Sequence, residues 1–422
     1  MGFKSITATV AAVLLLAGCS PGEPEALPYQ DTKLPFEKRV EDLLSRLSAA
    51  EKHELLQHSP GITTHPIWRL GIPGIKSRDL GRNAMAMAAA WDPDLVSREA
   101  REVADEAIAA NRREVIGPDL ADFGEDPWLA SRLAVAWVSA LQGEGVIATL
   151  KGFGRGDEIA QFPYEAAIEE AGLWAIEPAA GDPSLANALL KEDGGFRGFV
   201  AGAATDDDET EQARRRLRAM FGIGIFDVDT RPPGGPAPNR NESVVLMRNE
   251  GHLLPLASSV RSIVVIGGTS LAIPAECHAT VSYASPAEAV SLARKSEIAV
   301  IFGNDLTLIQ AVAAANPKTI AVLGRPARIT GQVPAVLAAW GRRDIGPFLF
   351  GQINPSGKLP IGLEPQFAFG SGLSYSEFTY SDLNIFPKTP RYGELVQVVV
   401  KIKNTGSRPG AEVAEVYVQK KL

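Results

Sequence analysis

The stretch QGEGVIATLKGFGRGDE, residues 142–158, decides the fold class of the amino-terminal half of the chain. It contains a short apolar run, residues 146–150, of the kind that forms a buried parallel strand. An amphipathic helical run precedes this strand, so the local order is helix, strand, loop and helix. Lys151 follows the strand, at the carboxyl end where β/α folds place their chemistry. The glycines after Lys151 lack the spacing of a phosphate-binding loop, so we expect no phosphate site there.

Length and composition are those of a globular protein with more than one domain. The chain has 422 residues, of which 45% are apolar and 22% are charged. The net charge of −8 argues against a nucleic acid or an anionic membrane surface as partner. The five histidines are scattered, so we expect no metal and no cofactor. Because Cys19 has a separate use, Cys277 is alone and no intramolecular disulfide is expected.

The first 19 residues have the pattern of an export signal. Lys4 supplies the positive end, residues 6–16 form an apolar core too short to span a membrane, and Cys19 follows two small residues. Leu-Ala-Gly-Cys resembles the bacterial lipoprotein box, which implies lipidation of Cys19; a plain secretory signal is the alternative. We therefore expect an exported protein, on the periplasmic side of the outer membrane or in the periplasm, touching a membrane only through its lipid. Residues 20–30 are rich in Pro and Glu and predict a tether.

Several motifs resemble glycoside hydrolase family 3, the family of many β-glucosidases and β-xylosidases. QGEGVIATLKGF, residues 142–153, is similar to the family segment Q-G-x-G-V-x-A-T-x-K-H-F. FGEDP, residues 123–127, matches a family motif literally, and LFGQINPSGKLP, residues 349–360, does so nearly. The resemblance covers most of the chain and implies a (β/α) barrel-like domain followed by an α/β sandwich domain.

The resemblance implies two residues that bind the hydroxyl groups of a sugar. Asp79 follows a GIPGI segment in the place of a family aspartate that grips the sugar, and Lys151 matches the lysine of the family's Lys-His pair. The alternative for Asp79 is a loop residue that caps the next helix. Gly152 stands where the family has histidine, which is a first departure from the pattern.

The two catalytic carboxylates are the larger departure. In ungapped register Ala203 occupies the place of the family nucleophile, and Asp206 is a weak candidate for a shifted one. The loop that carries the family's acid/base glutamate is missing, and Asp305 is the carboxylate left there, although a helix cap is the better interpretation. Glu125 and Asp126 also indicate capping at a helix entry. Only about five strand–helix units can be placed, where a closed barrel needs eight.

The second half of the chain predicts a parallel α/β sheet and then a short β region. Strands are expected at residues 263–266, 298–302 and 320–323, with helices at 286–296 and 306–315. Strands at 396–402 and 412–418 resemble part of a fibronectin-III-like domain. The expected division is residues 1–19 signal, 20–30 tether, 31–228 barrel-like domain, 229–240 linker, 241–366 α/β sandwich, and 367–422 partial fibronectin-III-like domain.

These observations leave three functions open. The family resemblance implies retaining hydrolysis of terminal β-D-glucosides, with a small carbohydrate or glycoside as ligand. A non-catalytic sugar-binding lipoprotein is the alternative that the missing carboxylates favour. A shortened homologue without function is the third, because the deletions remove whole elements. The sequence does not decide the oligomeric state.

Overall fold

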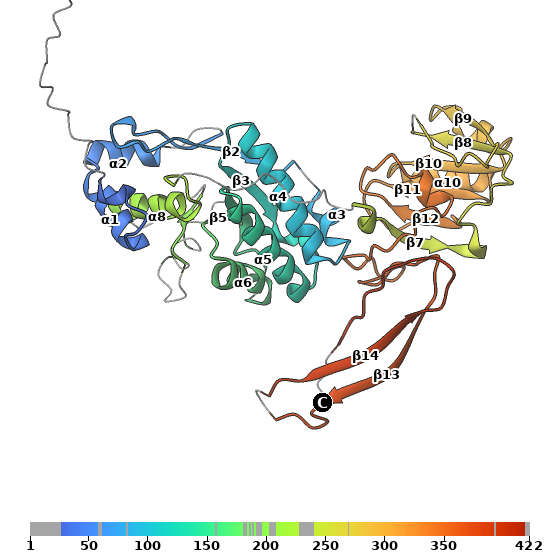
Figure 1. Ribbon diagram of the computed structural model, residues 1–422. Helices are drawn as coiled ribbons and strands as arrows, with labels where there is room; N and C mark the ends of the chain where they lie inside the picture. Colours follow the sequence, from blue (N-terminus) through green and yellow to red (C-terminus); the bar gives the residue numbers. More distant parts are fainter. Residues whose placement is uncertain are drawn as a thin grey trace, which may run out of the picture.

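The computed structural model describes residues 27–57, 61–81, 83–156, 158–179, 184, 187, 190, 196–201, 208–227, 240–268, 270–391 and 394–417. It contains two six-stranded sheets with their helices and a separate two-stranded hairpin (Figure 1). The expected signal peptide, Cys19, Ala203 and Asp206 lie outside the described residues.

The first sheet is an open half-barrel. Its strands pair in chain order: β1 (Ile62–Thr64), β2 (Ile75–Asp79), β3 (Glu114–Asp119), β4 (Ile147–Phe153), β5 (Ala175–Pro178) and β6 (Phe199–Val200). β1 is antiparallel to β2, and the other neighbours are parallel. Strands β1 and β6 are the two edges, so the barrel-like expectation holds only as a curled sheet.

Alternate residues of each strand pack on opposite faces. One face of the sheet packs on α3 (Ala84–Ala88), α4 (Pro93–Ala109), α5 (Pro127–Gly143) and α6 (Glu158–Ala171). The other packs on α1 (Phe36–Ser45), α2 (Ala49–Leu56) and α8 (Glu209–Gly222). Ala148 belongs to the first core and Ile147 to the second, as the two-residue period of a strand requires. We call the face toward α8 the inner face and the face toward α5 the outer face.

The second sheet confirms the expected parallel α/β pattern. Its order is β7-β12-β11-β10-β8-β9, with β7 (Val245–Asn249) antiparallel and the rest parallel. The other strands are β8 (Ser262–Ile266), β9 (Thr280–Ala284), β10 (Ile298–Phe302), β11 (Thr319–Leu323) and β12 (Ala335–Ala338). The helices are α9 (Ala289–Ala293), α10 (Leu306–Ala315) and α11 (Gly346–Leu349). Single turns of 3₁₀ helix are η1 (Pro28–Gln30), η2 (Trp68–Leu70), η3 (Leu120–Phe123), η5 (Arg240–Ser243) and η6 (Glu250–His252).

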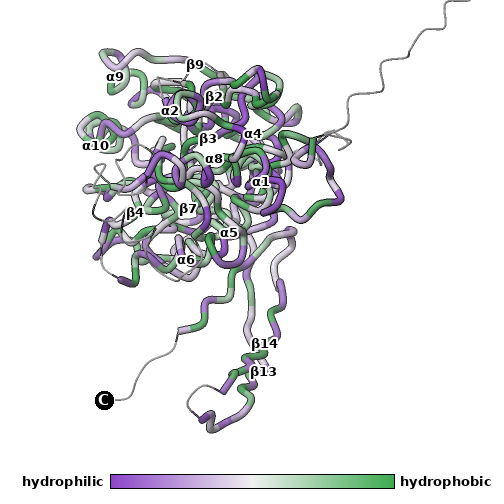
Figure 2. The backbone as a smooth tube through the Cα atoms, turned by 90° about the vertical axis from the view of Figure 1, so that its left-hand side faces the viewer, coloured by the Kyte–Doolittle hydropathy of each residue, from purple (hydrophilic) through white to green (hydrophobic). Residues whose placement is uncertain are grey.

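The β region after the second sheet is a long hairpin. Strands β13 (Phe378–Phe386) and β14 (Gln397–Asn404) are antiparallel and project away from both sheets (Figures 1 and 2). The strand expected at residues 412–418 is wrong, because residues 411–417 pair with no strand. Glu412 instead makes an ion pair with Lys358, at 2.8 Å between Oε1 and Nζ.

Two quoted motifs meet where the half-barrel contacts the second sheet. The backbone N–H of Glu125 donates to the carbonyl of Pro360 at 3.0 Å, and the N–H of Gly362 donates to the Glu125 carboxylate at 2.9 Å. Gly124 has φ +112°, and a Cβ there would lie 2.3 Å from the Pro360 oxygen. FGEDP and GKLP therefore form an interlocking contact, which we call the seam.

Candidate functional site

Three charged residues share the carboxyl ends of the half-barrel strands on the inner face. The register pairs Asp79 with Ile116, Ile116 with Thr149, and Lys151 with Glu177. Because residues paired across parallel strands point the same way, and residues two apart do too, Asp79, Lys151 and Glu177 face one side. We call this set the rim.

The centre of the rim is an ion pair. Lys151 Nζ lies 3.8 Å from Glu177 Oε1, and the two side chains are 38% and 33% exposed. The strand end below them is anchored, because the Tyr164 hydroxyl donates to the Lys151 carbonyl at 2.5 Å. An ammonium group and a carboxylate side by side offer donors and acceptors to neighbouring hydroxyl groups of a sugar.

Below the rim, the inner face is closed by a buried polar cluster. Thr149 Oγ1 donates to the Glu114 carboxylate at 2.6 Å, and Thr63 donates to its second oxygen. Arg216 of α8 lies over the Phe199 ring at 4.2 Å and donates to the Thr63 carbonyl at 2.8 Å. Burial raises the pKa of Glu114. The inner face is therefore filled near the amino ends of the strands and accessible at the rim.

Gly152, at the position of the family histidine, is required by its neighbour Asp119. The backbone of Gly152 has φ +90°, and a Cβ there would lie 2.5 Å from Asp119 Oδ1. Asp119 is held in place by Arg155, with 2.6 Å between Oδ2 and Nη1. A histidine at position 152 is thus incompatible with this position of Asp119. The replacement of the family histidine by Gly152 thus goes together with the Asp119–Arg155 ion pair.

A pocket of about 610 Å³ lies beside this pair, bordered by residues of α5 and α6 and by Ile361 from the second sheet region. Asp119, Glu125, Arg155 and Tyr164 are its polar lining residues. Burial raises the pKa of Tyr164 well above its usual range, with the Asp119 charge as a smaller cause. Burial, and then Asp119, also raise the pKa of the nearby Asp122 carboxyl.

Four sequence-predicted residues have defined places. Asp79 is exposed at the rim. It does not cap the next helix, because the Asn83 side chain caps α3 and accepts a hydrogen bond from the Ala86 N–H at 3.1 Å. Asp126 is the expected cap of α5, accepting from Leu129 N at 2.6 Å. Glu125 is not a cap, since its carboxylate binds the seam. Asp305 caps α10, accepting from Leu308 N at 3.0 Å, which is the use that its position favoured.

The chain between β10 and α10 is very short. Phe302 ends the strand and Asp305 already caps the helix, so two residues separate them. No loop that could carry an acid/base glutamate extends from this strand end. Ala203 and Asp206 lie outside the described residues; the last described residue before them is Ala201, whose N–H donates to the Ile176 carbonyl at 2.8 Å.

Glu177 and Arg155 are residues that sequence reasoning missed. Glu177 follows the apolar run of residues 173–176, and Lys151 follows the apolar run of residues 146–150. Because carboxyl ends of neighbouring parallel strands meet at one edge, this pairing could have been inferred. The Arg155–Asp119 contact had a weaker signal, since Asp119 ends strand β3 but the position of Arg155 depends on the path of the chain after β4.

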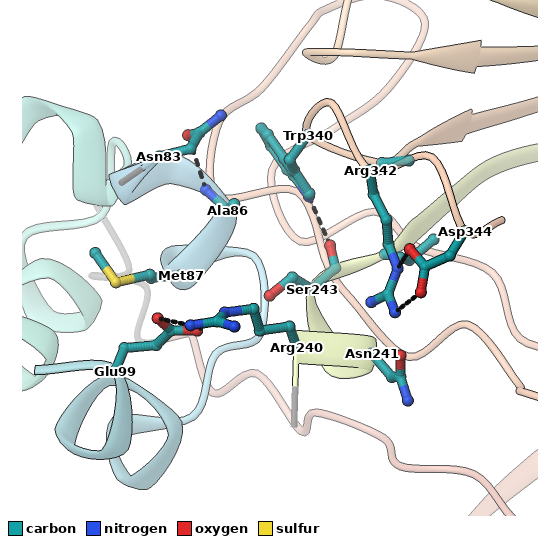
Figure 3. A pocket seen from close by; sticks show the side chains of 12 residues that line it. Asn83, Ala86, Met87, Glu99, Arg240, Asn241, Ser243, Trp340, Arg342 and Asp344 are labelled. Carbon is teal, nitrogen blue, oxygen red and sulfur yellow. Dashed lines mark hydrogen bonds and ion pairs between the residues drawn. The ribbon is translucent and has the colours of Figure 1, made fainter. Parts of the chain in front are cut away.

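A second pocket, of about 520 Å³, lies between α3, α4 and the second sheet (Figure 3). Several of its polar side chains are engaged in hydrogen bonds or ion pairs. Arg240 donates to Glu99 at 2.5 Å, Arg342 donates to Asp344 at 2.6 Å, and Trp340 donates to the Ser243 carbonyl at 2.6 Å. This pocket is part of the contact between the two sheets rather than a second chemical site.

The described part of the chain shows neither a metal-binding cluster nor a membrane-spanning helix. It holds no group of three or more His, Cys, Asp or Glu residues arranged to bind a metal ion. None of its helices is both long enough and apolar enough to cross a membrane.

Known proteins with similar sequences are family 3-type glycosidases. A β-xylosidase of Formosa agariphila is 23% identical over 621 residues, covering 91% of this chain and 85% of the relative. The thermostable β-glucosidase B of Acetivibrio thermocellus is 24% identical, covering 90% of this chain and 78% of the relative. The first match is longer than the 422 residues of this chain, so the relative has segments without a counterpart here. No family model matches the chain.

Solved structures agree at the level of fold. A β-glucosidase from Erythrobacter marinus superposes with a TM-score of 0.74 at 20% identity, covering 91% of this chain and 89% of the other. β-Glucosidase 3B from Thermotoga neapolitana, solved with α-D-glucose, gives 0.67 at 19% identity, covering 88% and 87%. The chain is thus similar to family 3-type glycoside hydrolases over most of its length and has their α/β fold with a shortened barrel.

Proposed function

We propose that this chain hydrolyses terminal β-D-glucosides and related β-glycosides with retention, and that the rim holds the terminal sugar. The observation that supports this most is the placement of Asp79, Lys151 and Glu177 on one face, at the carboxyl ends of parallel strands. The relatives are β-glucosidases and β-xylosidases, and one solved neighbour contains glucose.

Retaining hydrolysis needs a carboxylate nucleophile, and we assign this role to Glu177. It lies level with Ala201 on the neighbouring strand, because β5 and β6 pair Ile176 with Val200. Ala203 follows two residues later in the sequence and lies outside the described residues. Glu177 thus lies at the carboxyl end of β5, the strand that pairs with β6. Asp206 remains the alternative nucleophile.

The proposed step is a displacement at the anomeric carbon. A Glu177 oxygen forms a bond to that carbon while the glycosidic C–O bond breaks, and the leaving group departs with its electron pair. Water then attacks the same carbon, releases the carboxylate and the sugar, and gives its proton to solvent. Because Asp305 is engaged as a cap and its loop is short, we expect activity to require leaving groups that depart without proton donation.

The test is hydrolysis of 4-nitrophenyl β-D-glucoside by a soluble form of the chain that starts at Ser20 and so lacks the lipid site. We expect measurable release that falls at least about a hundredfold in Glu177→Gln, since a catalytic group typically contributes several orders of magnitude. The conservative amide keeps size and hydrogen-bonding capacity. Release that disappears in Asp206→Ala, and persists in Glu177→Gln, would transfer the role to Asp206.

A second candidate is sugar binding without turnover. The Asp305 cap and the short β10–α10 connection favour it, because they leave no evident proton donor at that strand end. Calorimetric titration with glucose distinguishes the two functions. Saturable binding by a folded protein that releases no nitrophenol would establish this candidate instead.

We also propose export with lipid attachment at Cys19, and an origin of residues 367–422 in a fibronectin-III-like domain. The lipoprotein-like segment supports the first and the β13–β14 hairpin the second. Labelling with a radioactive fatty acid tests the lipid: incorporation should disappear in Cys19→Ser.

A further inference from the structure

The second sheet has a topological switch point between β8 and β10. Its parallel strands lie in the order β9-β8-β10-β11-β12, so the chain first moves from β8 to one side and then returns to β10 on the other. Leu271, in the connection after β8, packs on one face of the sheet, whereas Ile309 of α10 packs on the other. The two connections therefore diverge. In open α/β sheets, a crevice that binds ligands lies at such a point, outside the carboxyl ends of the strands.

A cavity of about 170 Å³ lies at this place. Glycines near the carboxyl ends of four parallel strands border it: Gly267 after β8, Gly303 after β10, Gly324 after β11 and Gly341 after β12. A Cβ at Gly303 or Gly341 would meet nothing within 4 Å, so the backbone borders open space at these two points. At roughly 30 Å³ per water molecule, the cavity has the volume of about six waters, which suits a small oxyanion.

Two guanidinium groups line the cavity. Arg342 is held in place, because its Nε and Nη2 each donate to Asp344 at 2.6 Å (Figure 3) and its guanidinium lies 5.4 Å from the centroid of the Phe348 ring. This ion pair does not use the two N–H donors of Nη1. Arg343 is exposed, and within the described residues its side chain has no hydrogen-bond or ion-pair partner.

The loops at this edge are positively charged, although the whole protein is negatively charged. Residues 267–272, 303–305, 324–328 and 339–344 contain four arginines and two aspartates, a net charge of +2, whereas the chain has −8. Both aspartates are engaged, since Asp305 caps α10 and Asp344 binds Arg342. The electrostatic potential at the cavity therefore favours an anion.

The strand ends at the cavity are tied to each other. Asn304 Oδ1 accepts from the N–H groups of Gly324 and Arg325 at 3.0 and 3.3 Å, and Asn304 Nδ2 donates to the Arg325 carbonyl at 2.8 Å. These bonds hold the end of β10 against the end of β11. A site that is formed before its ligand arrives loses little conformational entropy on binding.

We propose that this cavity binds a phosphate group, either as inorganic phosphate or as the phosphate of an organic monoester. Arg343 and the Nη1 donors of Arg342 are its charged ligands. A planar guanidinium donates to two phosphate oxygens at once, and glycine backbones let the anion approach closely. The proposal is independent of the hydrolysis proposed at the rim, because none of the residues that line this cavity belongs to the rim.

The test is calorimetric titration of the soluble chain from Ser20 with inorganic phosphate and with glycerol 3-phosphate, a simple monoester. We expect saturable binding that weakens at least about tenfold in Arg343→Ala, because a hydrogen bond to a charged group contributes about that much affinity. Arg343→Lys should recover part of the affinity, since it restores the charge but not the planar fork. Tighter binding of glycerol 3-phosphate would identify a monoester as the ligand, and tighter binding of inorganic phosphate would identify the free anion.

Arg294→Ala is the matched control. Arg294 is also exposed, but it lies between α9 and β10, at the opposite ends of the strands, so its loss should leave phosphate affinity unchanged. Arg342→Ala is the second variant and should act in the same direction as Arg343→Ala.

Three results would overturn the phosphate site. They are a folded wild type that binds neither probe, affinities that stay unchanged in both cavity variants, and an equal loss of affinity in Arg294→Ala. None of them affects the proposed hydrolysis, which the nitrophenyl glucoside assay tests separately.

Discussion

The seam and the rim differ in how closely they follow the motifs that the sequence shares with family 3. At the seam, FGEDP and GKLP match the motifs, and Gly124, Glu125 and Pro360 contact one another. At the rim, Lys151 is followed by glycine instead of histidine, and its ion-pair partner Glu177 lies outside the quoted motifs. The shared motifs therefore indicate mainly how the half-barrel and the second sheet contact each other. The rim residues that differ from the motifs or lie outside them are the ones that bear on the chemistry.

Gly124→Val should produce the largest loss of stability. The new side chain would collide with the Pro360 carbonyl, and φ +112° is strained for any residue with a Cβ. We expect a cost of about 3–5 kcal/mol, measured by urea unfolding. Gly143→Ala is the control, because a Cβ at Gly143 meets nothing within 4 Å. A Gly124→Val protein as stable as this control would show that the seam does not support the fold.

Gly152→Ala should produce the next largest loss of stability, and the size of this loss should depend on Asp119. The added Cβ meets Asp119 Oδ1 at 2.5 Å in a backbone with φ +90°. We expect a loss of roughly 2–3 kcal/mol, from backbone strain and the steric contact together. In an Asp119→Gly background the steric part disappears, so the cost of Gly152→Ala should fall. Strictly additive effects in this double-mutant cycle would contradict the coupling.

Glu114→Gln should change how stability depends on pH. Burial raises the pKa of Glu114, so the folded protein binds the proton more tightly than the unfolded chain. Its contribution is therefore fully favourable below the unfolded pKa of about 4.3 and is lost as pH rises through the folded pKa. Glutamine does not titrate in this range. The free energy of unfolding of Glu114→Gln, relative to that of the wild type, should therefore be roughly 1–2 kcal/mol higher at pH 8 than at pH 4. Thermal unfolding across this range measures it; parallel curves for the two proteins would contradict it.

Rim substitutions should have the smallest effect on stability and a large effect on binding. Lys151→Ala removes a partly exposed side chain and Asp79→Asn neutralises an exposed one, so we expect changes in stability within about 0.5 kcal/mol. Glucose affinity should fall at least tenfold, because a hydrogen bond to a charged group contributes about 1.5–3 kcal/mol. Loss of stability without loss of binding would assign the rim a structural role instead.

Local signals predicted much of the fold. The strand β10 and the helix α10 appear at the expected residues, because an apolar run, a glycine and a capping aspartate define both. The open half-barrel also agrees with the five strand–helix units that could be placed, whereas the missing strand at 412–418 was less predictable. A strand requires a hydrogen-bonding partner, and Glu412 instead pairs with Lys358.

The site was only partly predictable for the same reason. Lys151 could be placed from its position after a buried strand. The contact of Gly152 with Asp119, and of Lys151 with Glu177, depends on register between segments that are distant in sequence. A single sequence contains the residues of such pairs, but it does not show which residue of one strand lies beside which residue of the next.

The most direct test of the account is trapping of a covalent intermediate. The soluble chain from Ser20 would be incubated with an activated 2-deoxy-2-fluoro-β-glucoside, which slows the second step of a retaining hydrolase and leaves the sugar on the nucleophile. We predict one added sugar by intact-protein mass spectrometry, located on Glu177 by peptide mapping. A folded protein that acquires no sugar, while it still binds glucose, would contradict hydrolysis and leave a sugar-binding protein.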